Sequence, residues 1–136
     1  MSINILVVED NTFIRKFTLR LFEELGYQPD YATNYQEAVN QLYNNQYDLI
    51  LTDIGLPDKN GIAVAEKIRE IEAKEKRPNA YVCGATAYAV DEYNSACLDA
   101  GMNDLAPKPI NLPFLEKLLH VATTFHKQDQ QTCSLK

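Results

Sequence analysis

The sequence predicts a doubly wound α/β domain, in which helices cover both faces of a parallel sheet. Several apolar runs are too short for a helix and nearly continuous rather than alternating, which is typical of strands buried on both faces. Stretches with a helical spacing of apolar residues lie between these runs, so strand and helix alternate along the chain. We therefore expect five strands and five helices in one domain.

The expected strands differ in strength. The first, third and fourth are rich in aliphatic or β-branched residues, whereas the second and fifth are weaker. In chain order they are residues 3–8, 28–32, 47–52, 80–85 and 103–106. The strands are separated by stretches of the length that a helix and its two loops need.

Two of the expected helices carry a clear apolar stripe. Apolar side chains recur at steps of three and four in the first helix, at Ile14, Phe17, Leu21 and Leu25, and in the last helix, at Leu115, Leu118, Leu119 and Ala122. This spacing places each set on one helix face, which predicts burial of that face against the sheet.

Residues suited to helix ends lie at the expected boundaries. Asn11 and Thr12 can cap the first helix, and Gly26 follows it where a left-handed residue is often needed. Further caps are expected at Asn34, with Glu37 three residues on in a capping-box arrangement, and at Asn111, with Pro113 in the first turn.

Composition narrows the class of protein. The chain has 136 residues and a net charge of -6, and its densest basic stretch, residues 67–77, is interleaved with glutamates as on a solvated helix face. Direct nucleic-acid binding is therefore disfavoured, because neutralising phosphates needs a basic footprint. One domain of this length buries a core without metal or disulfide staples.

The cysteines and the hydropathy indicate a cytoplasmic protein. Cys83, Cys97 and Cys133 form neither an even set nor a metal spacing, so we expect reduced thiols, with Cys83 in the core. There is no signal peptide, and no apolar run approaches the roughly 18 residues of a membrane span. The last residues are polar and aperiodic, so residues 127–136 are expected to form a flexible tail after a domain at 1–126.

Four polar residues lie at or just past the ends of four separate expected strands: Asp10, Asp53, Thr86 and Lys108. Ligand sites in open α/β sheets lie beyond the carboxyl ends of the strands, so these side chains are expected to meet in one crevice. Together with Glu9 they would gather three carboxylates. Two unit charges about 4 Å apart repel by roughly 4 kcal/mol at an effective dielectric near 20, so the cluster calls for a cation.

Mg²⁺ is the expected cation, because it prefers oxygen ligands and is commonly held by one or two carboxylates plus a substrate phosphate. Asp10 and Asp53 would bind it directly, and Glu9 through water. Asp53 is the expected nucleophile for a phosphoryl group, since it directly follows a buried-type strand and precedes a loop shaped by Gly and Pro. Lys108 and Thr86 would donate to phosphate oxygens.

Each of these residues alone has an ordinary explanation. A single Asp after a strand is more often a helix cap or a turn residue, and an isolated Thr or Lys says little. The agreement of four strand ends favours a phosphoryl-acceptor site. His120 and His126, on the last helix, are expected in a surface or groove position rather than as phosphate carriers.

Several motifs together resemble a known family. They are Val7-Val8-Glu9-Asp10-Asn11, Leu51-Thr52-Asp53-Ile54-Gly55-Leu56-Pro57-Asp58 with Asn60-Gly61, Gly84-Ala85-Thr86-Ala87, and Ala100-Gly101-Met102-Asn103-Asp104 leading to Lys108-Pro109-Ile110. The chain resembles, over about residues 3–126, the receiver domains of bacterial two-component response regulators. Because Glu9-Asp10-Asn11 replaces a paired Asp, it is most similar in style to receivers of hybrid sensor histidine kinases.

The resemblance implies a flavodoxin-like sheet in the order 2-1-3-4-5, with Pro107 on an edge strand and a cis bond between Lys108 and Pro109. It also implies that Asp53 is phosphorylated by a histidine kinase or a histidine phosphotransfer domain. Mg²⁺ would be held by Asp10, Asp53 and the backbone carbonyl of Gly55. The output would be contact with a downstream protein target through a surface made by the fourth helix, fifth strand and fifth helix.

The chain departs from the family pattern at the expected switch. Relatives carry Tyr or Phe three residues before the lysine, a ring that moves inward as the threonine swings toward the phosphate, whereas this chain has Leu105. Tyr88, two residues after Thr86, could sit over the site mouth or serve in recognition. Gly55 removes a side chain that in relatives influences attack of water on the phosphate.

Two alternatives follow from the same residues. A pseudo-receiver that binds proteins without taking phosphate is favoured slightly by Leu105 and disfavoured by the intact acids and Lys108. A Mg²⁺-dependent aspartyl phosphatase would also use this chemistry, but such enzymes usually place two aspartates two residues apart after the first strand. We therefore expect a phosphoacceptor that promotes its own phosphorylation and dephosphorylation rather than an enzyme acting on other substrates.

Overall fold

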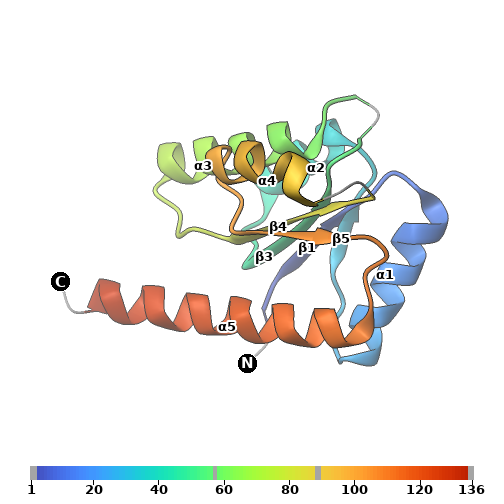
Figure 1. Cartoon of the computed structure of the whole chain (residues 1–136). Helices are drawn as coiled ribbons and strands as arrows, with labels where there is room; N and C mark the ends of the chain where they lie inside the picture. The colour runs from blue at the N-terminus through green and yellow to red at the C-terminus, as the bar shows by residue number, and fades with distance from the viewer. Residues whose placement is uncertain (1–2, 57, 88–89, 135–136) are drawn as a thin grey trace.

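The computed structural model describes residues 3–56, 58–87 and 90–134, with the side chains of 90–93 and 127–134 left out. Strands and helices alternate along these residues (Figure 1). The elements are β1 (Ile5–Val8), α1 (Thr12–Glu24), β2 (Asp30–Ala32), α2 (Tyr35–Asn44), β3 (Leu49–Asp53), α3 (Gly61–Glu75), β4 (Tyr81–Thr86), α4 (Val90–Asp99), β5 (Asp104–Pro107) and α5 (Leu112–Ser134).

The five strands form one parallel sheet in the order β2-β1-β3-β4-β5, which confirms the predicted fold class and strand order. Val8 pairs with Thr52, Asp53 with Ala85, and Thr86 with Pro107, so the strands end at nearly the same level. Pro107 lies on the edge strand, where it breaks no inner ladder. The Lys108–Pro109 bond is cis, as the resemblance implies.

Two hydrophobic layers enclose the sheet. Helices α2, α3 and α4 lie on one face, and α1 and α5 lie on the other (Figure 1). Residues of β1 alternate between the layers, because Leu6 and Val8 pack toward α2 and α3 while Ile5 and Val7 pack toward α1 and α5. Both faces of the strand are therefore buried, which explains its continuous apolar sequence.

The predicted stripe of α1 is wrong at Phe17, which is 47% exposed. The fully buried residues of this helix are Thr18 and Phe22, while Leu21 and Leu25 of the predicted stripe are partly buried and pack against the same core cluster. Two helical stripes can be drawn through this segment. One runs through the exposed Phe13 and Phe17, and the other runs through the buried Thr18 and Phe22. The stripe predicted for α5 is confirmed, because Leu115, Leu118, Leu119 and Ala122 are all buried.

The predicted helix caps are present. Side-chain oxygens of Asn11, Asn34 and Asn111 accept hydrogen bonds from backbone N–H groups three residues on, at 2.9, 2.8 and 2.9 Å. Glu37 departs from the usual capping box, because its carboxylate accepts from the Thr33 N–H at 2.8 Å rather than from the cap residue. Gly26 has a φ of 90° and takes the left-handed position predicted for it.

The end of the chain differs from a simple tail. Helix α5 continues to Ser134, beyond the expected end of the domain at residue 126. Polar residues with good helix propensity, such as Lys127 and Gln128, can prolong a helix without an apolar stripe. The domain boundary at 126 and the flexibility of residues 127–136 stay predictions.

Two further sequence expectations concern the core and the membrane. Cys83 and Cys97 are buried free thiols, and Cys83 lies in the core as predicted. Burial raises the pKa of the Cys83 thiol strongly. Among the residues that the structure describes, no helix combines the length and the hydropathy needed to span a membrane.

Candidate functional site

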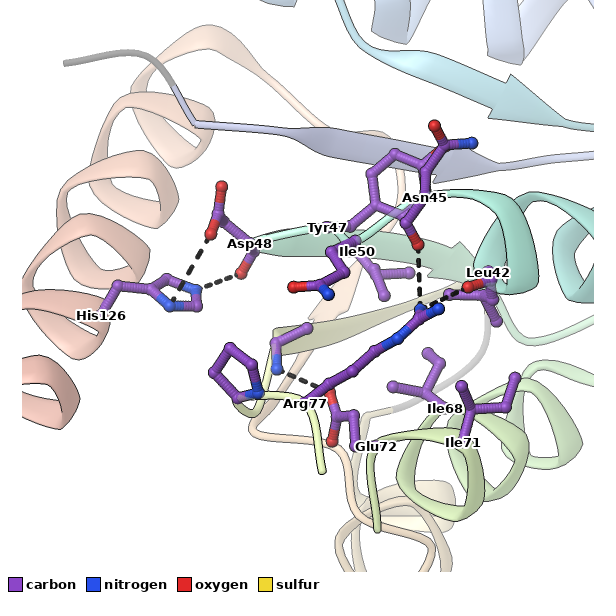
Figure 2. A pocket seen from close by; sticks show the side chains of 13 residues that line it. Leu42, Asn45, Tyr47, Asp48, Ile50, Ile68, Ile71, Glu72, Arg77 and His126 are labelled. Carbon is purple, nitrogen blue, oxygen red and sulfur yellow. Dashed lines mark hydrogen bonds and ion pairs between the residues drawn. The ribbon is translucent and has the colours of Figure 1, made fainter. Parts of the chain in front are cut away.

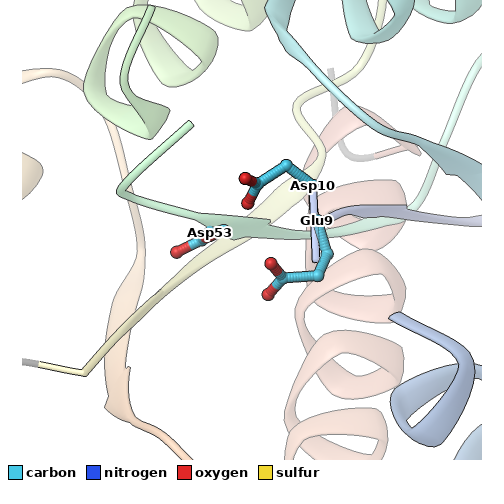
Figure 3. Close-up of side chains that lie close together, drawn as sticks. All are labelled: Glu9, Asp10 and Asp53. Atoms are coloured by element: carbon cyan, nitrogen blue, oxygen red, sulfur yellow. The ribbon is translucent and has the colours of Figure 1, made fainter. Parts of the chain in front are cut away.

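Three carboxylates meet at the carboxyl ends of the central strands. Glu9 and Asp10 follow β1, and Asp53 is the last residue of β3 (Figure 3). One carboxylate oxygen of each lies within 4.8 Å of the others. Glu9 and Asp53 are 5% and 8% exposed, whereas Asp10 faces solvent. The parallel register brings these side chains together, although Glu9 and Asp53 are far apart in sequence.

Lys108, which follows β5, neutralises part of this cluster. Its Nζ lies 2.6 Å from Glu9 Oε1 and 3.0 Å from Asp53 Oδ1. Burial disfavours the ammonium, but the hydrogen bonds to Glu9 and Asp53 and the charges of these two acids together outweigh it and raise the pKa of Lys108. Burial also raises the pKa of Glu9; the Lys108 hydrogen bond opposes this and the charge of Asp53 adds to it. The acid cluster therefore favours the charged form of Lys108, whose ammonium lies beside Asp53.

A cleft opens next to Asp53. It has a volume of about 370 Å³ and is lined by Asp53, Ile54, Gly55, Asn60, Thr86, Ala87 and Lys108. Thr86, the last residue of β4, is 2% exposed and lies at the wall of this cleft. The Gly55 N–H donates to Asp53 Oδ1 at 3.2 Å, which orients the carboxylate. The cleft therefore brings Asp53, Thr86 and Lys108, from the ends of three strands, around one space.

The acidic cluster fits Mg²⁺. Its donors are all oxygens, and a hard cation that keeps several waters needs only one or two carboxylates from the protein. Both oxygens of Glu9 are already engaged, one with Lys108 and the other with the Asn11 N–H at 3.1 Å. This supports direct contact through Asp10 and Asp53 and contact of Glu9 through water.

The loop between β3 and α3 is held at several points. Asn60 caps α3 by accepting from the Ala63 N–H at 3.1 Å, and the Gly61 N–H donates to the Ile54 carbonyl at 2.8 Å. Asp58 reaches across to α2, where it accepts from the Tyr35 N–H at 2.9 Å. Hydrogen bonds to backbone N–H groups, that of Tyr35 foremost, lower the pKa of Asp58. The loop that follows Asp53 is therefore tied to two helices.

The expected switch residues are placed in part. Leu105 lies on β5 opposite Gly84, is half-buried, and packs against the core cluster that contains Met102. The Lys108 N–H donates to the Thr86 carbonyl at 2.8 Å, which links the ends of β4 and β5. Tyr88 lies outside the described residues. The roles of Thr86, Leu105 and Tyr88 in switching stay predictions.

The two histidines lie on α5, and neither belongs to the cluster of Glu9, Asp10 and Asp53. His126 points from α5 toward the amino end of β3, where its Nε2 lies 2.5 Å from the Asp48 carbonyl oxygen (Figure 2). It lines a cavity of about 40 Å³ together with Asp48, Glu72 and Arg77. His120 is exposed. These positions agree with the groove and surface locations expected from the sequence.

Sequence reasoning missed two residues near the site. Arg15 on α1 donates from Nη1 to the carbonyl oxygens of Glu9 at 3.1 Å and Asp10 at 3.4 Å. Asn60 lines the cleft in addition to capping α3. The available signal for Arg15 was its place in the second turn of a helix that starts at the acidic loop, which brings a long side chain back toward that loop.

Proteins with similar sequences and structures belong to a family that the site residues also indicate. The family model described as the response regulator receiver domain matches residues 5–120. Hybrid signal transduction histidine kinase K of Dictyostelium discoideum is 31% identical over 93% of this chain, which covers 11% of that protein. The chain spans about a tenth of the length of the first such kinases that it matches.

Two solved structures resemble the whole fold. One is the receiver domain of Saccharomyces cerevisiae Ssk1, crystallised with the histidine phosphotransfer protein Ypd1, at 32% identity, 85% coverage of each chain and a TM-score of 0.77. The other is the receiver domain of sensor histidine kinase PA1611 from Pseudomonas aeruginosa, with a magnesium ion in its active-site cleft, at 30% identity, coverage of 88% and 95%, and a TM-score of 0.76. Relatives thus extend beyond the bacteria that the resemblance suggested. This chain belongs to the response regulator receiver domain family and is a receiver domain of two-component phosphorelays.

Proposed function

We propose that Asp53 accepts a phosphoryl group from a phosphohistidine of a partner protein in a Mg²⁺-dependent reaction. The observation that carries this proposal is the position of the Asp53 carboxylate. It ends a central strand, lines the cleft, and lies both beside the Lys108 ammonium and within 4.8 Å of the other two acids. The same constellation gives a function to two buried carboxylates, Glu9 and Asp53, at the carboxyl ends of the central strands.

In the proposed reaction an oxygen of Asp53 forms the new bond to phosphorus while the bond from phosphorus to the imidazole nitrogen breaks and leaves its electron pair on that nitrogen. Lys108 stabilises charge on one phosphoryl oxygen, and the Thr86 hydroxyl donates to another. Asp10 and Asp53, with Glu9 through water and the Gly55 carbonyl, would hold Mg²⁺. When bound, the ion neutralises charge on the transferred group.

The phosphoryl donor is a histidine kinase or a histidine phosphotransfer domain. The crystallised complex of the Ssk1 receiver with Ypd1 supports a donor of this class. The surface beside the cleft suits a protein, because Phe13 on α1 is 79% exposed and follows Asp10 by three residues. Phe17, one helical turn further along α1, is 47% exposed, and two neighbouring exposed Phe rings on one helix face favour contact with another protein surface.

Phosphorylation would then act on a downstream protein target. It adds roughly 1.5 to 2 negative charges, which draw Thr86 and Lys108 toward the phosphate. These residues end β4 and follow β5, so a shift there reaches α4 and the start of α5. A tenfold change between two arrangements of this surface needs only about 1.4 kcal/mol of differential interaction.

The test compares wild type with Asp53→Asn after incubation with acetyl phosphate and Mg²⁺, read by intact mass. We expect one added phosphoryl on wild type and none on Asp53→Asn or after EDTA treatment. Asp58→Asn is the matched control, because it removes a carboxylate from the same loop that points to α2 instead of the cleft. It should be labelled like wild type.

Other outcomes identify the alternatives. Wild type that takes no phosphoryl group while binding a phosphotransfer protein is a pseudo-receiver. Turnover of many equivalents of a phosphate ester, lost in Asp53→Asn, makes the chain a phosphatase. The proposal of a phosphoacceptor that is not a turnover enzyme requires that only its own aspartyl phosphate forms and decays.

A further inference from the structure

We infer that Arg15, held in place by Tyr31, positions the loop of Glu9 and Asp10 and thereby sets the affinity of the acid cluster for Mg²⁺. This inference rests on the proposed function, since it concerns the same cluster. It assigns a role to a cation that contacts the backbone of the acids and not their carboxylates.

Arg15 is fixed from two sides. From the second turn of α1 its Nη1 donates to the Glu9 carbonyl at 3.1 Å and to the Asp10 carbonyl at 3.4 Å. Its guanidinium carbon lies 5.1 Å from the centre of the Tyr31 ring, in the range of a cation–π contact. Arg15 therefore links the end of β1 to β2 as well as to its own helix.

The loop depends on such contacts because packing does not orient Asp10, whose side chain faces solvent. Glu9 is held by its N–H, which donates to the Ala32 carbonyl at 3.0 Å, and by its carboxylate, which binds Lys108 and the Asn11 N–H. For Asp10, the donor on the carbonyl is Arg15. Losing Arg15 removes the side-chain donor on the carbonyls on both sides of Asp10 and leaves the Asn11 N–H bond to the Glu9 carboxylate to hold this segment, so the Asp10 carboxylate is oriented less firmly.

The sign of the effect separates positioning from charge. A guanidinium near three acids repels an incoming cation, so an Arg15 that acted through its charge alone would weaken Mg²⁺ binding, and removing it would tighten binding. A positioning residue has the opposite signature: its removal weakens binding. Residues that orient metal ligands typically contribute about 10- to 100-fold to metal affinity.

The experiment titrates the full chain with Mg²⁺ alone and follows the amide NMR signals of Asp10 and Asn11. We expect roughly tenfold weaker binding in Arg15→Met and in Arg15→Lys, because an ammonium cannot both stack on a ring and span two carbonyls. Tyr31→Leu should weaken binding about threefold, and Tyr31→Phe, which keeps the ring, should bind like wild type. Arg20→Met removes the same charge from an exposed position of α1 and should leave binding unchanged.

A second readout is the rate of phosphoryl uptake from acetyl phosphate as a function of Mg²⁺. In the Arg15 variants the half-saturating Mg²⁺ concentration should rise while the rate at saturating Mg²⁺ stays that of wild type, since Asp53, Thr86 and Lys108 are intact. A general loss of structure would lower the saturating rate as well, so this split distinguishes positioning from damage.

The inference is overturned if Arg15→Met binds Mg²⁺ as tightly as wild type or more tightly. If Arg15→Met does not fold, Arg15→Lys and Tyr31→Leu decide in the same way, and wild-type affinity in both overturns it. Wild type that neither binds Mg²⁺ nor takes a phosphoryl group overturns the proposed function together with this inference. Wild type that does both, with unaltered Arg15 variants, overturns the inference alone.

Discussion

Individual residues around Asp53 are constrained by the backbone that carries it. A Cβ at position 61 would lie 2.3 Å from the Asp53 carbonyl oxygen and 3.0 Å from the Ile54 Cα. These are backbone atoms, so a side chain cannot push them aside without moving Asp53. Position 61 thus needs glycine for space, because α3 begins against the strand end that presents the carboxylate.

We therefore predict that Gly61→Ala lowers the free energy of unfolding by about 1 to 3 kcal/mol, the usual cost of overpacking. It should also slow phosphoryl uptake, because Asp53 is displaced. Urea unfolding and intact mass after timed incubation with acetyl phosphate measure the two effects. Gly55→Ala is the control, since a Cβ there meets nothing within 4 Å; equal stability of both variants would contradict the prediction.

At the scale of elements, the helix ends show where local sequence and structure disagree. Helix α3 ends at Lys76, which has a φ of 54° and a ψ of 40°. A left-handed conformation costs a residue with a Cβ about 1 to 2 kcal/mol, and glycine normally takes this position. The residue that follows, Arg77, donates from Nη1 to the Leu42 carbonyl at 2.6 Å, near the carboxyl end of α2. This contact offsets part of the conformational cost at Lys76.

Lys76→Gly should accordingly raise the free energy of unfolding by roughly 0.5 to 1 kcal/mol, because relief of the left-handed strain exceeds the entropic cost of glycine. Chemical denaturation at neutral pH measures the change. Lys76→Ala keeps the Cβ and removes the charge, so its stability should stay near that of wild type. A stabilisation of equal size in Lys76→Ala would assign the effect to charge and refute the conformational explanation.

At the scale of the whole molecule, the site joins strands that are far apart in sequence. Lys108 and Glu9 form their ion pair across a separation of 99 residues, and Asp53 comes from the middle of the chain. The cluster exists only when β1, β3 and β5 are in place, so a ligand that binds it stabilises the entire fold.

Mg²⁺ should therefore raise the unfolding temperature of the whole chain. At a free concentration of about 100 times Kd the gain is about 2.7 kcal/mol. Asp10→Asn, which removes a proposed ligand from the exposed rim, should lose most of this gain. Thermal melts with MgCl₂, compared with NaCl at equal ionic strength, provide the measurement. An equal rise of the unfolding temperature in both salts would show that the stabilisation comes from screening of the acidic charges and not from Mg²⁺ binding.

Several features of the fold and the site follow from local sequence. Continuous apolar runs predicted the central strands, and asparagines predicted the caps of α1, α2 and α5, whereas the edge position of Pro107 came from the family resemblance. The gathering of Glu9, Asp10 and Asp53 could be predicted for a general reason. Parallel strands bring their carboxyl ends to one edge, so residues at those ends meet whatever the length of chain between them.

Other features were decided only by tertiary contacts. Local spacing could not choose between Phe17 and Phe22 as the buried side of α1, because both fit a helical stripe, and the sheet accepts just one face. Nor could it reveal the Arg15 contact with Tyr31, the reach of Asp58 to α2, or the pairing of Lys108 with Glu9. Periodicity and propensity act between near neighbours and so determined the elements, whereas these contacts depend on how the elements pack, which brings together groups that the chain keeps apart.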